Sequence, residues 1–351
     1  GEGRGILCVN HEYTNEELMF PGLGEQYTKG FADMTPGIVA VEMAAHGGSV
    51  VEIARGADGR WAEVLDSPYN RRITASTEMT FDGPAAGHER MTTSADPTGM
   101  KVLGTFNNCA GGITPWGTYL MAEENCHGYF WSENVESDGR PTLEGQADAA
   151  KKKRYGLPGM WFAWGAHVDR FDIDKEPNEP NRFNWIVEVD PIDPTSVPVK
   201  HTAMGRFRHE GAESAVTADG RVVVYSGDDA RFDYVYKFVS SGTVGDDREA
   251  NKRLLSQGTL YVARFNDDGT VDWLALVHGQ GPLTAENGFP SQADVLIDTR
   301  LAADALGATP MDRPEDIEPD GKGRAYVMLT NNTRRRPGQQ DAANPRPENA
   351  F

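Results

Sequence analysis

The chain has 351 residues, of which 38% are hydrophobic and seven are tryptophan, so it can bury a sizeable core. It carries 53 acidic against 34 basic side chains, a formal net charge of -19 at pH 7. A surface of this sign repels nucleic acid and anionic membranes, which argues against both as partners, and a phosphorylated substrate would need bound cations to approach it. No apolar run reaches the roughly 20 residues of a membrane helix, so we expect no membrane insertion. The chain opens at Gly1 without an initiator methionine or a signal peptide, which is typical of a segment of a longer precursor.

Short apolar runs alternate with turn residues along most of the chain and predict strands. After ILCV (6–9), these runs are GIVAVEM (37–43), SVVEIA (49–54), NWIVEVD (184–190), RVVVYSG (221–227), YVYKFV (234–239), TLYVARF (259–265) and RAYVMLT (324–330). Asp-Gly pairs mark hairpin turns between them, as in FNDDGTVDW (265–273). Helical periodicity is weak and shows only around 141–153 and 294–306. Many short strands at regular spacing predict an all-β sandwich, barrel or propeller.

A repeat favours the propeller among these. RHEGAESAVTADGRVVVYSGDD (208–229) and RPEDIEPDGKGRAYVMLTNNT (313–333) both run from Arg-X-Glu through a short strand and a turn to a second strand and a polar cluster. NNCAGGITPWGTYLMAEEN (107–125) fits the same plan more loosely. Self-similar hairpins are the sequence pattern of propeller blades, whose innermost strands meet at a central channel.

In this alignment Cys109 takes the place of Glu210 and Glu315, and Glu124 takes the place of Asp229 and Asn332. Convergence would put one thiolate and four carboxylates around one axis, where mutual repulsion raises pKa values unless cations hold the groups ionised. Carboxylates suit Ca²⁺, whereas a thiolate added to them suits iron or another transition metal. The sequence contains no paired histidine ligands and no CxxC spacing, so we do not expect a zinc site of the familiar kinds.

Each of these residues also has a structural interpretation. A single cysteine is more often a buried small hydrophobe, an acidic pair after a strand is usually a solvated turn, and Arg-X-Glu can be an ion pair within a blade. The repetition favours the functional interpretation, because a turn needs no matching acid at both ends of a hairpin. Glu12, in Asn10-His11-Glu12, is either a further metal ligand or an ordinary strand end. Lys151 to Arg154 form a basic run that we expect in an exposed loop.

Several motifs together resemble the PhoX-type alkaline phosphatases, in the same order from end to end. They are NHEYTNE (10–16), GPAAGHERMTTSADPTG (83–99), GTFNNCAGGITPWGTYLMAEEN (104–125), NWIVEVDPIDPTSVPVKHTAMGRFRHEGAE (184–213), YSGDDARFDYVYKFVS (225–240), GTLYVARF (258–265) and MDRPEDIEP (311–319). The resemblance implies a single β-propeller domain over 1–351 with short helical insertions and a central cluster of Fe³⁺ and Ca²⁺. It further implies a monomeric enzyme, exported to the periplasm or secreted, that releases phosphate from small-molecule phosphate monoesters at alkaline pH.

The resemblance also implies roles for single residues. Cys109 is expected to bridge two ferric ions and to take part in catalysis, with Glu210 and Asp229 at the iron pair. Arg313 is expected to grip the phosphoryl oxygens, with Asn108 also at the substrate. The calcium ions are expected to be held by Glu315 and by the acidic end of AEEN, which is Glu123 or Glu124. Glu12 remains a further candidate metal ligand on its position after Asn10 and His11.

Two departures from the family pattern stand out. The chain has Asn107-Asn108-Cys109-Ala110-Gly111-Gly112 where family members carry NNCANG, and it stops at Phe351 where they continue with more strands and ligands. Two expectations stay open: the chain is either a piece of a longer protein or a short relative of the family, and in both cases closure of the propeller and full metal occupancy are left open.

Two alternatives stay open at this point. Cys8 and Cys126 would pair in an exported protein, or all three cysteines would stay reduced in a cytosolic one. The rival function is a propeller with structural calcium that binds a ligand without turnover, or a calcium-dependent lactonase, since one fold hosts many functions.

Overall fold

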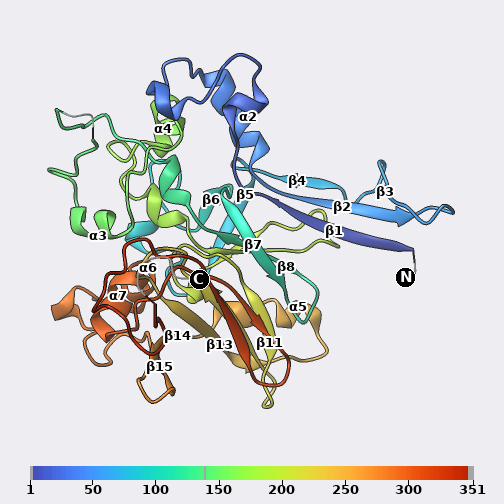
Figure 1. The fold of residues 1–351 in the computed structure, drawn as a ribbon. Coiled ribbons are helices and arrows are strands. Elements are labelled where there is room, and N and C mark those ends of the chain that lie inside the picture. Colours follow the sequence, from blue (N-terminus) through green and yellow to red (C-terminus); the bar gives the residue numbers. More distant parts are fainter. Residues whose placement is uncertain (1–2, 138–139, 347–351) are drawn as a thin grey trace.

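The computed structural model describes residues 3–137 and 140–346, which form four β-sheets with short helices between them (Figure 1). The chain end at Phe351, where the predicted propeller stops, lies outside the described residues. The first sheet contains β1 (Arg4–His11), β2 (Gly47–Arg55), β3 (Trp61–Glu63) and β4 (Arg71–Ile73). The second contains, in spatial order, β6 (Lys101–Leu103), β5 (Glu78–Asp82), β10 (Val199–His201), β9 (Ile186–Val189), β8 (Tyr119–Glu123) and β7 (Asn108–Ile113). The third contains β11 (Glu213–Val216), β12 (Arg221–Gly227), β13 (Val235–Thr243), β14 (Gly258–Phe265) and β15 (Val271–Ala275), and the fourth contains β16 (Pro314–Pro319) and β17 (Ala325–Leu329).

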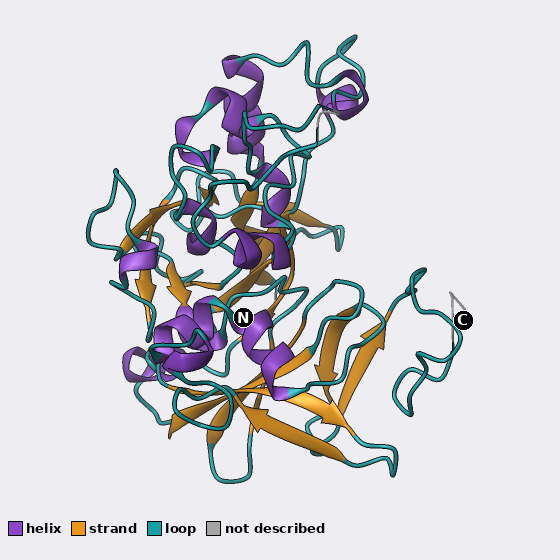
Figure 2. Ribbon diagram, turned by 90° about the vertical axis from the view of Figure 1, so that its left-hand side faces the viewer, coloured by secondary structure: helices purple, strands orange, loops and turns teal. Residues whose placement is uncertain are grey.

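The helices are short, and Figure 2 shows a group of them above the sheets. The α-helices are α1 (Glu16–Met19), α2 (Pro36–Ala45), α3 (Ala149–Arg154), α4 (Trp164–His167), α5 (Arg248–Asn251), α6 (Gln292–Ile297) and α7 (Thr299–Leu306). The 3₁₀ turns are Tyr27–Lys29, Glu89–Met91, Cys126–Tyr129, Asp169–Phe171, Glu179–Arg182, Thr202–Met204, Leu254–Ser256 and Ala285–Asn287. No helix among the described residues is long and apolar enough to span a bilayer. The fold is thus mostly β with short helical insertions, as the strand pattern predicts.

One predicted strand is wrong. The run 37–43 is part of the helix α2, which starts with Pro36 at its first turn, and Thr35 caps it by accepting a hydrogen bond from the Ile38 amide at 3.3 Å. The capping residue and the proline outweigh the β-branched side chains that follow them. The other predicted strands are confirmed, as is the hairpin at 265–273, while the helical signal at 141–153 corresponds only to α3.

Strands β8 and β9 lie between two apolar clusters, and both of their faces are buried. On β8, Leu120 belongs to one apolar cluster and Met121 to another. On β9, Ile186 and Val187 are divided between the same two clusters. Side chains alternate between the faces of a strand, so a continuous apolar run is what a strand between two cores requires.

An edge strand of each sheet lies against an edge strand of the next sheet. Strand β1 contacts β7, β7 contacts β11, and β11 contacts β16. The Asn10 side-chain amide donates to the carbonyl oxygens of Cys109 and Ala110, both at 2.8 Å, and the Ala110 amide donates to the Glu210 carbonyl at 2.8 Å. Residues that start or end these strands are therefore brought together although they lie about a hundred positions apart.

All three cysteines are free in the structure. Cys126 is fully buried, and its thiol donates to the Phe106 carbonyl oxygen at 3.5 Å. Cys8 lies on β1 opposite Val50 of β2. The pairing of Cys8 with Cys126, which the sequence left open, is not made.

Candidate metal centre

Cys109 lies on β7, whose backbone is packed closely against β8. The pairing of β7 with β8 shifts register between Asn108 and Gly111, which is a bulge beside Cys109. A Cβ atom on Gly111 would lie 2.1 Å from the Leu120 carbonyl oxygen. The backbone therefore has no room at Gly111 for the asparagine of NNCANG, and the cysteine of the pattern is present as Cys109.

Five of the predicted ligands come together where strands of the first three sheets start or end. The sulfur of Cys109 and carboxylate oxygens of Glu12 and Glu124 lie within 4.8 Å of one another. Carboxylate oxygens of Glu124, Glu210 and Asp229 form a second such group, so that Glu124 is common to both. The two groups are also linked directly, because the Cys109 thiol donates to Glu210 Oε1 at 3.1 Å. We call Glu12, Cys109, Glu124, Glu210 and Asp229 the acid cluster.

Burial and like charges raise the pKa values of four acids of the cluster, which are Glu12, Cys109, Glu124 and Glu210. Burial, and after it the charge of Glu210, raises the pKa of the Cys109 thiol far above its usual range. Burial raises the pKa of Glu124 to about 9, and the carboxylates of Glu210 and Asp229 add to the shift. Burial is also the largest cause of the raised pKa values of Glu12 and Glu210. Such a group of acids stays ionised only when cations compensate it.

The donor set fits a mixed metal site. One thiolate among carboxylates suits iron, and the remaining carboxylate oxygens suit calcium. Asn10 supports this assignment, because its side-chain oxygen is buried without a hydrogen-bond partner in the described part of the chain, next to the Cys109 backbone. An amide oxygen in that position matches the hard donors that calcium prefers.

Arg313 stands at the edge of the acid cluster, at the start of β16. Its guanidinium donates two hydrogen bonds to Asp229, from Nε at 2.9 Å and from Nη2 at 2.7 Å, and Nη2 lies 3.3 Å from Glu315. The backbone of Arg313 adopts φ of 53°, in the left-handed region that is costly for an arginine. A strained backbone and a two-point contact both fix the direction of the guanidinium fork. Glu315 itself has a raised pKa, mainly through burial.

The structure does not bring Glu123 and Asn108 to the acid cluster. Glu123 is fully buried, where its carboxylate lies 2.6 Å from Lys200 Nζ and accepts from Thr105 at 2.8 Å. Asn108 is also fully buried and donates to the Thr105 hydroxyl at 2.8 Å. Because successive side chains of a strand point to opposite faces, Glu123 and Glu124 cannot both face the cluster.

Asn107, which the sequence analysis passed over, shapes the site instead of Asn108. It has φ of 50°, its carbonyl accepts from the Glu124 amide at 2.9 Å, and its side-chain oxygen accepts from the Asn125 amide at 2.5 Å. These bonds fix the end of β8 and hence the direction of Glu124. The available signal was the residue type, since asparagine tolerates the left-handed conformation better than most residues.

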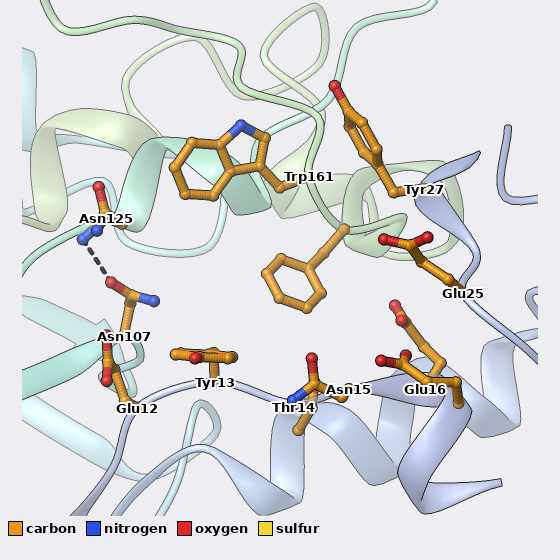
Figure 3. A pocket seen from close by; sticks show the side chains of 12 residues that line it. Glu12, Tyr13, Thr14, Asn15, Glu16, Glu25, Tyr27, Asn107, Asn125 and Trp161 are labelled. Atoms are coloured by element: carbon orange, nitrogen blue, oxygen red, sulfur yellow. Dashed lines mark hydrogen bonds between the residues drawn. The ribbon is translucent and has the colours of Figure 1, made fainter. Parts of the chain in front are cut away.

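Two cavities of opposite charge flank the acid cluster. The acidic cavity, of about 440 Å³, is lined by Glu12, Glu16, Glu17 and Glu25 together with aromatic and amide side chains. Figure 3 shows Glu12 and Asn107 near one end of it, and Glu16 and Glu25 near the other.

The basic cavity, of about 560 Å³, adjoins the acidic cavity. It contains Asp229 and Arg313 and shares Asn125 and Trp161 with the acidic cavity. Six further basic residues line it: Lys153, Arg154, Arg208, Arg231, Arg300 and Arg334. The expectation of an exposed loop for 151–154 is wrong, because these residues lie in α3, Lys152 is buried and Arg154 is paired with Asp233 at 2.5 Å. Nothing in the local sequence connects this helix with Arg208 or Arg334, because only the fold brings them together.

Comparisons with known proteins show the family of this chain. The family model described as alkaline phosphatase PhoX matches residues 1–351. Among solved structures, Pseudomonas fluorescens PhoX in complex with vanadate, described as a transition state analogue, is 45% identical and superposes with a TM-score of 0.91. That alignment covers 99% of this chain and 60% of the other, so the chain spans about three fifths of the length of that relative. None of the curated proteins matches the chain. The match over the whole chain shows that this protein belongs to the PhoX alkaline phosphatase family.

Proposed function

We propose that the protein is a metal-dependent phosphatase that hydrolyses small-molecule phosphate monoesters at the acid cluster. The observation that carries the proposal is the meeting of one thiol, four carboxylates and the Arg313 fork at one place, where bound cations would compensate the acids and hold a phosphate ester. Membership of the PhoX family supports the same reaction. We further propose Fe³⁺ and Ca²⁺ as the cations, with Cys109, Glu210 and Asp229 on the iron side and Glu12, Glu124 and Glu315 on the calcium side.

The residues of the chain have defined tasks in this reaction. Arg313 presents a planar fork that matches two phosphoryl oxygens, and Asp229 and Glu315 hold that fork in place. The interaction strengthens as charge develops on the equatorial oxygens. The proton that Cys109 shares with Glu210 must leave before a cation binds, because thiolates and carboxylates coordinate only when deprotonated. Bound cations would supply charge stabilisation of the phosphoryl group and a water molecule of lowered pKa.

Fold and location complete the proposal. Four sheets whose edge strands adjoin, β1 with β7, β7 with β11 and β11 with β16, support a single propeller domain over 1–351 with the acid cluster in its channel. The family resemblance supports export to the periplasm or the medium, and action as a monomer.

The rival functions lack comparable support. A propeller with structural calcium, or a calcium-dependent lactonase, has no need of a thiol in the cluster or of a strained arginine aimed at it. Family membership does not favour either of them.

The proposed function is tested by phosphate release from 4-nitrophenyl phosphate at alkaline pH, with the chain loaded with iron and calcium. The chain should be active, and the Glu210→Gln variant should lose most of that activity. Glu213→Gln, three residues further along on β11 and outside the acid cluster, is the matched control and should stay active. Absence of phosphate release from the loaded chain, or equal activity of both variants, would contradict the proposal.

A further inference from the structure

We propose that the basic cavity binds a second anionic group of the substrate, so that the protein prefers phosphate monoesters carrying an additional carboxylate or phosphate. This inference rests on the proposed phosphatase function and adds a substrate class to it. The observations that carry it are the unpaired charges of the cavity, its position next to Arg313 and its contrast with the acidic cavity.

Some of the basic residues in the cavity already have carboxylate partners. Arg154 pairs with Asp233 and with Asp304, at 2.5 and 2.8 Å. Arg300 donates from Nε to Asp228 at 2.8 Å. These arginines, like Arg313 with Asp229, are compensated within the fold.

The other four have no such partner. Among the described residues, no carboxylate lies within ion-pair distance of Lys153, Arg208, Arg231 or Arg334. The cavity therefore has a surplus of positive charge within a chain whose net charge is -19. A local field of this sign attracts anions and orients them on approach.

The wall of the basic cavity leaves room for the side chain of Arg208. Gly156 follows α3 with φ of 73°, and a Cβ atom on it would lie 3.0 Å from Nη2 of Arg208. A glycine at this position therefore keeps space beside the guanidinium of Arg208. Arginine forks suit carboxylate and phosphate groups, and about 560 Å³ is enough for a small anionic group and its contacts.

The position of the basic cavity beside the acid cluster indicates where the leaving group of a bound ester would lie. Arg313 and Asp229 belong to its lining, so a phosphoryl group held by Arg313 is already at its edge. The adjoining acidic cavity presents Glu16, Glu17 and Glu25, which repel a second negative group. An anionic leaving group is attracted to the basic cavity and repelled from the acidic one, whereas an uncharged leaving group gains neither effect.

The kinetic test compares two esters that differ by one charged group, glycerate 3-phosphate and glycerol 3-phosphate, with the chain loaded with iron and calcium. We expect kcat/KM to favour glycerate 3-phosphate by about 10- to 100-fold, the range of one or two charge-assisted contacts. In Arg208→Gln and in Arg231→Gln this ratio should fall toward one. The matched control is Arg264→Gln, an exposed arginine paired with Asp272 on the β14–β15 hairpin, which should keep the ratio of the unmodified chain.

A binding measurement gives a readout without turnover. By calorimetry, 3-phosphonopropionate should bind more tightly than propylphosphonate, and Arg208→Gln should remove the difference. If the chain hydrolyses neither ester, the proposed function is contradicted, and the calorimetric comparison still decides on the basic cavity. Equal kcat/KM for both esters, equal binding of both phosphonates, or a preference that persists in both arginine variants would overturn the inference while the phosphatase function stands.

Discussion

Arg313 and Asp229 form a two-point contact that joins the fourth sheet to the acid cluster, with N–O distances of 2.9 and 2.7 Å. Asp229 is at the same time one of the five residues of that cluster. The residue proposed to bind the phosphoryl group is thus held by a residue proposed to bind metal, so that occupation of the metal site and direction of the guanidinium are coupled.

We therefore expect Arg313→Lys to lower kcat/KM for 4-nitrophenyl phosphate by about 100-fold, although the charge is kept. A lysine is a single flexible point charge and cannot reproduce the planar fork. Steady-state kinetics measures the effect, and metal content by elemental analysis serves as the control. Activity within a few-fold of the unmodified chain would show that charge alone matters at this position.

Glu123 and Glu124 have different tasks, which are separated by removing the ion-pair partner of Glu123 in one variant and the carboxylate of Glu124 in another. Lys200→Met leaves the carboxylate of Glu123 buried without its partner, and we expect a loss of about 3–5 kcal/mol in the free energy of unfolding. Urea unfolding measures this loss. Glu124→Gln should instead lower the iron and calcium content and leave stability within about 1 kcal/mol.

The opposite pattern would reverse our assignment of these neighbours. If Lys200→Met removed metal at unchanged stability, or if Glu124→Gln unfolded the chain at full metal content, Glu123 rather than Glu124 would be the metal ligand. If one variant loses both metal and stability, metal content is measured at a urea concentration well below the unfolding midpoint. Metal that is missing there is missing from the folded chain.

Stability should depend on pH through Glu42, which lies on α2 away from the acid cluster. Glu42 is fully buried, accepts from the Trp164 indole at 3.0 Å, and lies near Glu16. Burial, and after it the charge of Glu16, raises the pKa of Glu42 well above its usual range. Above about pH 4.3 the unfolded chain releases this proton more readily than the folded one, so the free energy of unfolding falls as pH rises.

The slope should reach at most about 1.4 kcal/mol per pH unit for this one group and level off once Glu42 is ionised in the folded chain as well. Thermal unfolding at several pH values above 5 measures it, with Glu42→Gln as the comparison, because glutamine keeps an acceptor for Trp164 but does not titrate. An unchanged slope in Glu42→Gln would assign the pH dependence to other groups.

The sequence predicts those features whose signal is either local or repeated along the chain. The strand at 221–227 was predictable because its run of β-branched residues and the Asp-Gly turn before it agree locally. The meeting of Cys109, Glu124, Glu210 and Asp229 was predictable because a repeated hairpin plan carries long-range information.

The failures concern signals that compete or that only the fold creates. At 37–43 the β-branched residues suggested a strand, yet Pro36 and the Thr35 cap start a helix. The choice between Glu123 and Glu124 depends on which face of β8 is buried against Lys200, and strand composition alone does not give that face. The basic cavity joins α3 to residues 208, 231 and 334, which share no local motif.

The most direct test of the central claim is metal analysis and visible absorption of the purified chain, read beside phosphate release by the same sample. We predict iron and calcium together, a visible iron-thiolate absorption band and phosphatase activity at alkaline pH. Iron, absorption band and activity should be lost together in Cys109→Ser and kept in Cys8→Ser. A colourless chain that contains calcium without iron, or activity that is unchanged in Cys109→Ser, would contradict the account.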